Sequence, residues 1–182
     1  MPTGAGKSLC YQVPAMLLSG IKLVISPLIS LMQDQVKALN EAGVNAAFIN
    51  SSLSEKELND TFKNAYKGHY KIIYVAPERL MSEGFISFAK SVEISMVTID
   101  EAHCISQWGQ DFRPSYMDIA EFINILDKRP IISAFTATAT QNVREDIICS
   151  LWLSNPYFLV TGFDRENLFF QVDKPQNKER FI

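Results

Sequence analysis

The sequence lacks the features that mark several common protein classes. Only three cysteines occur among its 182 residues, Cys10, Cys104 and Cys149, and they show no paired CxxC spacing. This pattern predicts reduced thiols in a cytosolic protein, without a disulfide framework or a cysteine metal site. No stretch approaches the roughly 18 uninterrupted apolar residues of a membrane span. The N-terminus also lacks the pattern of a signal peptide.

An excess of positive charge is missing too. The chain has 17 Lys and Arg against 20 Asp and Glu, a formal net charge of −3. Composition therefore gives no sign of nucleic-acid binding, and such a function has to be argued from local residues. The length and a hydrophobic fraction of 47% suit one globular domain with a real core. We place this domain at 1–162 and interpret 163–182 as a connector.

Short, mostly apolar runs predict strands. Their near-continuous apolarity is typical of strands covered on both faces, as in a parallel sheet. The runs are Lys22–Ser26, Ala46–Asn50, Lys71–Val75, Ile94–Ile99, Ile131–Phe135 and Phe158–Val160.

Helical patterns alternate with these runs. A strand–helix alternation implies right-handed crossovers and a doubly wound α/β domain, with a mostly parallel sheet flanked by helices. Several residues mark where helices begin or end. They are Gly43 after an apolar helical repeat, Ser54 with Glu57, Ser115 with Asp118, and Thr140.

Polar clusters follow four of the predicted strands directly, at 26–27, 76–79, 100–103 and 136–138. Ligands of open α/β sheets bind outside the carboxyl ends of the strands. We therefore expect these clusters to share one edge of the sheet with the N-terminal loop.

That loop has the composition of a phosphate-binding loop. Its glycines allow successive backbone N–H groups to point at phosphate oxygens, and the helix that follows aims its positive end at the same anion. Lys7 would reach the β- and γ-phosphates of ATP, and Ser8 would bind Mg²⁺. Met1 stands where the full pattern has its first glycine, so a plain glycine-rich turn is the alternative. The assigned residues are Thr3, Gly4, Ala5, Gly6, Lys7 and Ser8.

Two adjacent carboxylates end the apolar run at 94–99. Unpaired buried charge is costly, and a bound metal with a water-activating role would account for both groups. Asp100 would hold Mg²⁺, Glu101 would polarise the attacking water, and His103 would sense the bound nucleotide. The alternative is a strand end with solvated acids and a satisfied histidine.

Five motifs in order resemble the RecQ family of superfamily 2 helicases with the DEAH spelling, over essentially the whole chain. They are MPTGAGKSLCYQ at 1–12, SPLISLMQDQV at 26–36, DEAHCISQWGQDFRPSY at 100–116, TATAT at 136–140 and FDRENL at 163–168. The resemblance implies the first of two RecA-like lobes, truncated at its N-terminus before the phosphate loop. It also implies ATP between the lobes, 3′-to-5′ movement on single-stranded DNA, and a location at the nucleoid or in the nucleus.

The segment 104–116 is rich in aromatic residues, which can stack on unpaired bases without sequence preference. By resemblance, Trp108, Phe112 and Arg113 contact DNA, and Gln107 couples that contact to hydrolysis. The alternative is that Trp108, Phe112 and Tyr116, spaced four apart, form the core face of a helix. Two features argue against a regular helix, Gly109 and Pro114. Gln110 replaces the histidine usual in the family.

Other clusters carry weaker signals. Ser26 and Arg79 resemble the family's DNA-backbone contacts, although both lie where ordinary turns occur and Arg79 could pair with a carboxylate instead. Thr136 and Thr138 resemble the motif that links nucleotide state to strand separation, or they simply cap a helix. Glu166 replaces a proline that is common in the family.

The leading hypothesis is therefore the ATP-binding half of a DNA helicase, with a second lobe and single-stranded or partly duplex DNA as partners. A second hypothesis is a fragment that binds nucleotide or DNA weakly without turnover. A third is another P-loop ATPase used for remodelling or signalling, which the segment 104–116 disfavours. Loss of one of the family's strands also predicts an unpaired sheet edge and marginal stability of the isolated chain.

Overall fold

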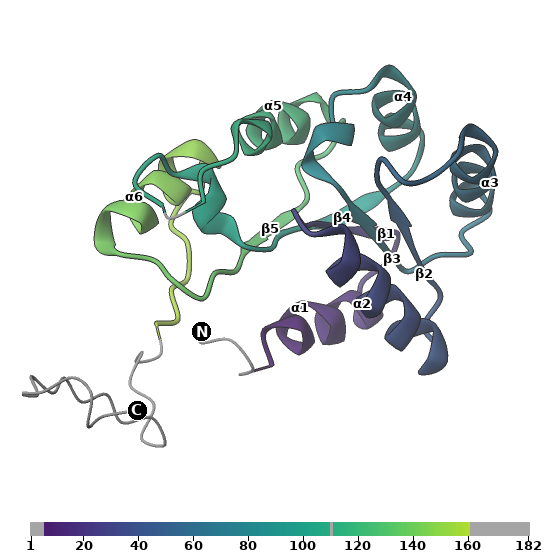
Figure 1. The fold of residues 1–182 in the computed structure, drawn as a ribbon, viewed down its shortest axis with the longest axis horizontal. Coiled ribbons are helices and arrows are strands. Elements are labelled where there is room, and N and C mark those ends of the chain that lie inside the picture. The colour runs from purple at the N-terminus through teal and green to yellow at the C-terminus, as the bar shows by residue number, and fades with distance from the viewer. Residues whose placement is uncertain (1–5, 110, 161–182) are drawn as a thin grey trace, which may run out of the picture.

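Five parallel strands form one sheet in the computed structural model, which describes residues 6–109 and 111–160 (Figure 1). The order across the sheet is β2-β3-β1-β4-β5, and every pairing is parallel. This confirms the predicted doubly wound α/β fold. The strands are β1 (Ile21–Ile25), β2 (Ala46–Ile49), β3 (Ile72–Val75), β4 (Ile94–Ile99) and β5 (Ile131–Ala134).

Helices cover both faces of the sheet, as its apolar strands require. One face carries α1 and α2, and the other carries α3, α4, α5 and α6. None of these helices is long and apolar enough to cross a membrane, within the part of the chain that the structure describes. The helices are α1 (Lys7–Leu17), α2 (Ile29–Glu41), α3 (Glu55–Tyr66), α4 (Glu83–Ser91), α5 (Asp118–Ile125) and α6 (Gln141–Ser150).

Most predicted helix ends are confirmed. Ser54 and Glu57 form both hydrogen bonds of a capping box on α3, and Thr140 accepts from the backbone of α6. The predicted start at Ser115 is wrong, because Pro114 opens a short 3₁₀ turn over Pro114–Tyr116 and α5 begins at Asp118 without a side-chain cap. Helix α4 was not predicted from the sequence.

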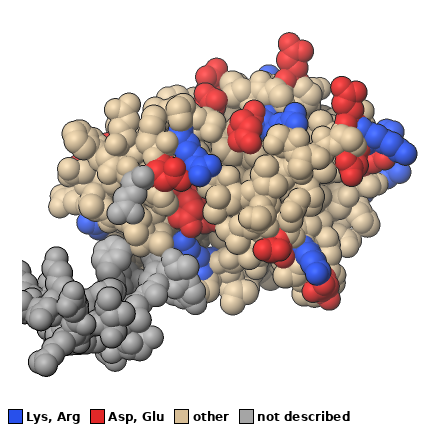
Figure 2. All heavy atoms as spheres, in the orientation of Figure 1, with Lys and Arg blue, Asp and Glu red and all other residues tan. Residues whose placement is uncertain are grey.

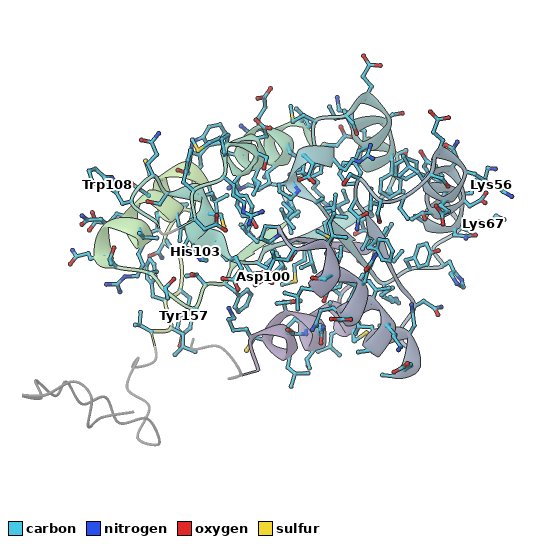
Figure 3. The ribbon with its side chains drawn as sticks, viewed as in Figure 1. Lys56, Lys67, Asp100, His103, Trp108 and Tyr157 are labelled. Carbon is cyan, nitrogen blue, oxygen red and sulfur yellow. The ribbon has the colours of Figure 1, made fainter. Side chains whose placement is uncertain are left out.

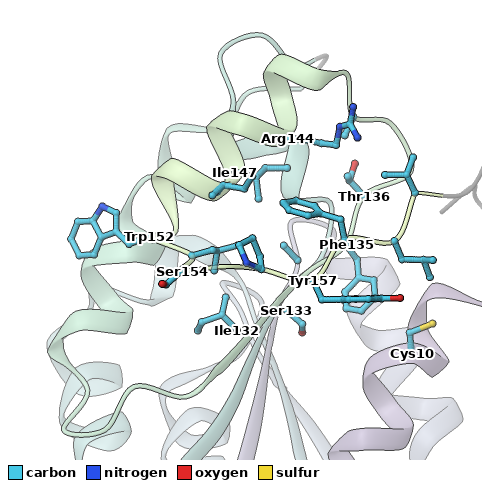
Figure 4. Close-up of a pocket in the computed structure, with 18 of the residues that line it drawn as sticks. Cys10, Ile132, Ser133, Phe135, Thr136, Arg144, Ile147, Trp152, Ser154 and Tyr157 are labelled. Carbon is cyan, nitrogen blue, oxygen red and sulfur yellow. The ribbon is translucent and has the colours of Figure 1, made fainter.

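The predicted strand Phe158–Val160 is wrong. These residues lie outside the sheet, and their side chains are more than half exposed. A strand needs a hydrogen-bonded neighbour, and β5 pairs only with β4 among the described residues. Between β5 and this segment lies a cavity of about 650 Å³, with Cys10 of α1 and Ile147 of α6 on its walls (Figure 4). The edge of β5 is correspondingly open, and Ile131 is 55% exposed.

Candidate active site

The carboxyl ends of the central strands bring the predicted site residues together. Asp100 follows β4, and its backbone N–H donates to the carbonyl of Ile25 at the end of β1 (2.9 Å). The N–H of Ala102 donates to the carbonyl of Phe135, just beyond β5 (2.9 Å). Helix α1 begins at Lys7, whose side chain reaches the same edge. The prediction that these clusters share one edge of the sheet is confirmed.

The N-terminus of α1 is suited to an anion. Its N-cap, Gly6, has a left-handed conformation (φ 78°), which glycine adopts at little cost, and no described side chain caps the helix. The first backbone N–H groups and the positive end of the helix dipole are therefore available to phosphate oxygens. The predicted loop residues Thr3, Gly4 and Ala5 lie outside the described residues.

Glu101 lies between two of the predicted functional groups. Its Oε1 is 3.2 Å from the Nζ of Lys7, and its Oε2 is 3.4 Å from the Nδ1 of His103. All three side chains are half-buried. The carboxylate of Glu101 is therefore paired with Lys7, the residue predicted to bind phosphate. It also lies beside His103, the residue predicted to sense the nucleotide.

Asp100 and Glu101 differ in their surroundings although they are adjacent. Asp100 is buried, and its Oδ1 accepts from the backbone N–H of Glu101 (3.0 Å). Burial, followed by the negative charge of Glu101, raises the pKa of Asp100, and Lys7 partly offsets this. Glu101 itself has a left-handed backbone (φ 47°, ψ 45°), which is strained for a non-glycine residue.

His103 connects the acidic motif to the segment after β5. Its Nδ1 is 2.9 Å from the hydroxyl of Thr136. That hydroxyl also donates to the carbonyl of Thr138 (3.0 Å) and accepts from its N–H (3.2 Å). The predicted coupling residues Thr136 and Thr138 therefore form one compact turn against His103.

Two of the three aromatic residues in the segment 104–116 lie at the surface, and the third is buried. Trp108 is 76% exposed and projects away from the molecule (Figure 3), and Phe112 is 36% exposed. The core-helix alternative is therefore wrong for these two residues. Tyr116 is buried, as that alternative expected, with 1% of its surface exposed. Its hydroxyl donates a hydrogen bond to the carbonyl of Asp100 (2.9 Å). Gln110 lies outside the described residues.

The contacts that hold this loop were not predicted from the sequence. The buried hydroxyl of Ser106 donates to the Oδ2 of Asp146 on α6 (2.5 Å) and accepts from the backbone N–H of Trp108 (3.1 Å). Gly109 packs so closely that a Cβ there would lie 2.4 Å from the carbonyl oxygen of His103. The loop is thus fixed both to α6 and to the acidic motif, and Asp146 carried no signal in the sequence because the contact is purely tertiary.

Arg113 follows the exposed Phe112, and its guanidinium already forms hydrogen bonds within the protein. Its Nε and Nη2 donate to the Oδ2 of Asp111 (3.1 and 2.9 Å), and its Nη1 donates to the carbonyl of Pro27 (3.3 Å). The hydrogen bond to Asp111 raises the pKa of Arg113 above its ordinary value. Gln107 is exposed nearby. On the face shown in Figure 2, basic and acidic side chains are interspersed.

The other predicted DNA contacts are less favourably placed. Ser26 is only 1% exposed, and its hydroxyl has no partner among the described residues. This burial contradicts the prediction that Ser26 faces DNA, because the residue directly follows β1 in the centre of the sheet. Arg79 is half-buried and makes no ion pair within the described part of the chain, so the predicted pairing with a carboxylate is not found there.

A second group that the sequence analysis missed lies behind the start of α1. The amide nitrogen of Gln12 donates to Gln35 (2.9 Å) and to the hydroxyl of Tyr74 (3.0 Å). Tyr11 is buried beside them, and its hydroxyl interacts with those of Tyr74 and Ser8. Burial is the main cause of the raised pKa of Tyr11. These contacts fasten the first turns of α1 to the sheet.

Comparison with known proteins matches this arrangement to a family. The family model described as DEAD/DEAH box helicase matches residues 1–146. The ATP-dependent DNA helicase RecQ of Bacillus subtilis is 53% identical over all of this chain, which covers 31% of that relative. RecQ of Pasteurella multocida is 45% identical over 94% of the chain and 27% of the relative. The chain therefore spans less than a third of the length of these relatives.

Solved structures agree on the fold. The helicase domain of Pyrococcus furiosus Hef superimposes with a TM-score of 0.63 at 20% identity, over 85% of this chain and 32% of that one. The helicase MrfA bound to DNA gives a TM-score of 0.64 at 19% identity, over 84% of this chain and 22% of that one. At such identities the likeness concerns the fold alone.

Proposed function

Because this chain belongs to the DEAD/DEAH box helicase family, we propose that it is the ATP-binding lobe of a RecQ-like DNA helicase. The parent protein would couple ATP hydrolysis to 3′-to-5′ movement on single-stranded DNA, and to duplex unwinding in recombination and repair. The observation that carries the proposal is the contact series Lys7–Glu101–His103–Thr136, with an exposed aromatic loop attached to it. The direction of movement rests on the family resemblance alone.

Hydrolysis requires the Lys7–Glu101 pair to open. ATP phosphates at the N-terminus of α1 would draw the Nζ of Lys7 away from Glu101, because they carry more negative charge than one carboxylate. Glu101 is then free to orient a water molecule and to accept its proton as the water oxygen bonds to the γ-phosphorus. The bond from the γ-phosphorus to the β–γ bridging oxygen breaks in the same displacement, and ADP leaves. His103 contacts both Glu101 and Thr136, so it can report this exchange to the segment after β5.

The donor set fits Mg²⁺ as an ion shared with nucleotide phosphates. The described residues contain no cluster of three or more His, Cys, Asp or Glu that could hold a metal by themselves. Mg²⁺ typically keeps waters and binds through one or two protein oxygens plus phosphates. Ser8 and the buried Asp100 would supply those two oxygens. When bound, the ion would neutralise phosphate charge that develops during hydrolysis.

DNA is proposed to lie across the loop 106–113. Trp108 and Phe112 offer faces for unpaired bases, at about 1–3 kcal/mol per base. Arg113 could exchange Asp111 for a phosphate. The interspersed charge in Figure 2 makes stacking, more than a basic surface, the main source of affinity on this face.

The test compares ATP turnover by this chain with turnover by the same protein extended to both lobes, each with and without single-stranded DNA. We expect only the extended protein to turn over ATP, and DNA to stimulate it. Hydrolysis without any response to DNA would remove the helicase assignment. For the chain alone, the closed Lys7–Glu101 pair opposes turnover, because it occupies both the proposed phosphate-binding lysine and the proposed base.

A further inference from the structure

The loop that presents Trp108 is held by a carboxylate from a distant helix. We propose that Asp146 is a positioning residue that fixes Trp108 for stacking on single-stranded DNA. The inference rests on the proposed DNA-binding function. Asp146 lies on α6, 40 residues beyond Ser106, and its Oδ2 accepts a hydrogen bond from the Ser106 hydroxyl, with 2.5 Å between the two oxygens. The same hydroxyl oxygen accepts the backbone N–H of Trp108 at 3.1 Å.

These two bonds fix the direction of the hydroxyl. Ser106 must donate to Asp146, because a carboxylate only accepts, so its lone pairs are left for the N–H of Trp108. Hydrogen bonds to a carboxylate are short and roughly twice as strong as neutral ones. Ser106 is buried, so water competes little for the pair.

Trp108 needs such a support because its ring is mostly exposed. A side chain with so little packing keeps its direction mainly through its backbone. That backbone is held on one side by Ser106 and on the other by Gly109, whose N–H donates to the carbonyl of Ser106 (3.0 Å). Without Asp146 the Ser106 hydroxyl is free to rotate, and stacking would have to order the loop first.

The same contacts close a ring around the site. His103 touches Thr136, and the chain runs from there through Thr140 into α6, which carries Asp146 back to Ser106. From Ser106 the backbone returns to His103 through a hydrogen bond between their main-chain groups (3.1 Å). A displacement of Thr136 would therefore reach Trp108 through Asp146 as well as through His103.

Charge alone predicts the opposite of this proposal. An acidic residue beside a DNA-binding loop repels phosphate, so its removal should tighten binding. If Asp146 instead positions Trp108, its removal weakens binding. Glu145 is a matched control, because it is exposed on the same helix and accepts a side-chain hydrogen bond only from Gln141 among the described residues.

The experiment uses the full chain carrying Trp152→Phe, which leaves Trp108 as the only tryptophan. Fluorescence anisotropy and acrylamide quenching of Trp108 are measured without DNA. Affinity is then measured with labelled oligothymidylate. We expect Asp146→Ala to increase the mobility of Trp108 and to weaken DNA binding at least fivefold, in line with partial loss of one stacked base. Glu145→Gln should leave Trp108 mobility unchanged and bind equally or slightly tighter.

Two further variants separate the possible failures. Combined with Trp108→Ala, the substitution Asp146→Ala should cause no further loss of DNA affinity, because both substitutions act through the indole side chain of Trp108. Ser106→Ala removes the same bond with a smaller change, so it decides the matter if Asp146→Ala does not fold. Unchanged Trp108 mobility in Ser106→Ala and Asp146→Ala would overturn the inference. If Trp108→Ala binds DNA like the parent, the proposed DNA function fails instead, and the mobility measurement still decides the role of Asp146.

Discussion

Substitution of Gly109 by alanine would disturb the contact between the aromatic loop and the acidic motif. A Cβ at Gly109 lies 2.4 Å from the carbonyl oxygen of His103 and 3.0 Å from that of Ser106. Both oxygens belong to the backbone, so neither can rotate away as a flexible side chain would. The loop or the 3₁₀ turn Ala102–Ile105 must therefore shift to restore ordinary contact.

The expected cost follows from overpacking of a rigid contact, which is about 1–3 kcal/mol. For a chain of this size, each kcal/mol lowers Tm by about 2–4 °C, so a decrease of about 2–12 °C is expected. The shift also displaces Trp108, so the affinity for single-stranded DNA should fall together with Tm. Thermal unfolding followed by circular dichroism, with DNA titration of the folded protein, measures both effects.

Gly84→Ala is the matched control for this change. Gly84 lies in the first turn of α4, and a Cβ there meets no atom within 4 Å. Alanine is favoured over glycine in a helix by about 1 kcal/mol, so this variant should unfold at the same or a higher temperature. If Gly109→Ala also unfolds at or above the parent Tm and binds DNA normally, the argument from close packing is refuted.

Three other perturbations have defined outcomes. Glu101→Gln should lower ATP turnover of the two-lobe protein at least 10²-fold, with nucleotide binding retained; normal turnover would remove Glu101 as the base. Burial raises the pKa of Cys104 to about 11, whereas Cys10 and Cys149 are exposed. A thiol reagent at pH 8 should therefore label two cysteines in the folded chain and the third only after unfolding, and three rapid reactions would contradict the burial. The open edge of β5 predicts self-association of the chain, and Ile131→Lys should reduce it in sedimentation experiments; unchanged association would exclude that edge as its cause.

The fold and the position of the site were predictable because their causes are local in the sequence. Apolar strands covered on both faces dictate a parallel sheet, and a parallel sheet puts every strand's carboxyl end on one edge. Lys7, Asp100 and Glu101 could therefore be brought together without coordinates. Ser54 and Thr140 were predictable as caps because each bonds within its own first turn.

The errors have a different origin, since they depend on neighbours that a sequence does not name. Phe158–Val160 has the composition of a strand but no strand beside it in the described structure. Ser26 looked like a turn residue and is buried because β1 is central. Asp146 lies in a helix with no motif, and only the tertiary fold brings it to Ser106.

The left-handed backbone of Glu101 implies a conflict between foldability and chemistry at that position. This conformation costs an L-residue about 1–2 kcal/mol, a cost that glycine escapes. A library at position 101 selected for protease resistance should therefore enrich glycine, while the same library selected for ATP turnover should keep glutamate. Sequence design guided by the backbone alone would erase the proposed base and return a more robust protein without its activity.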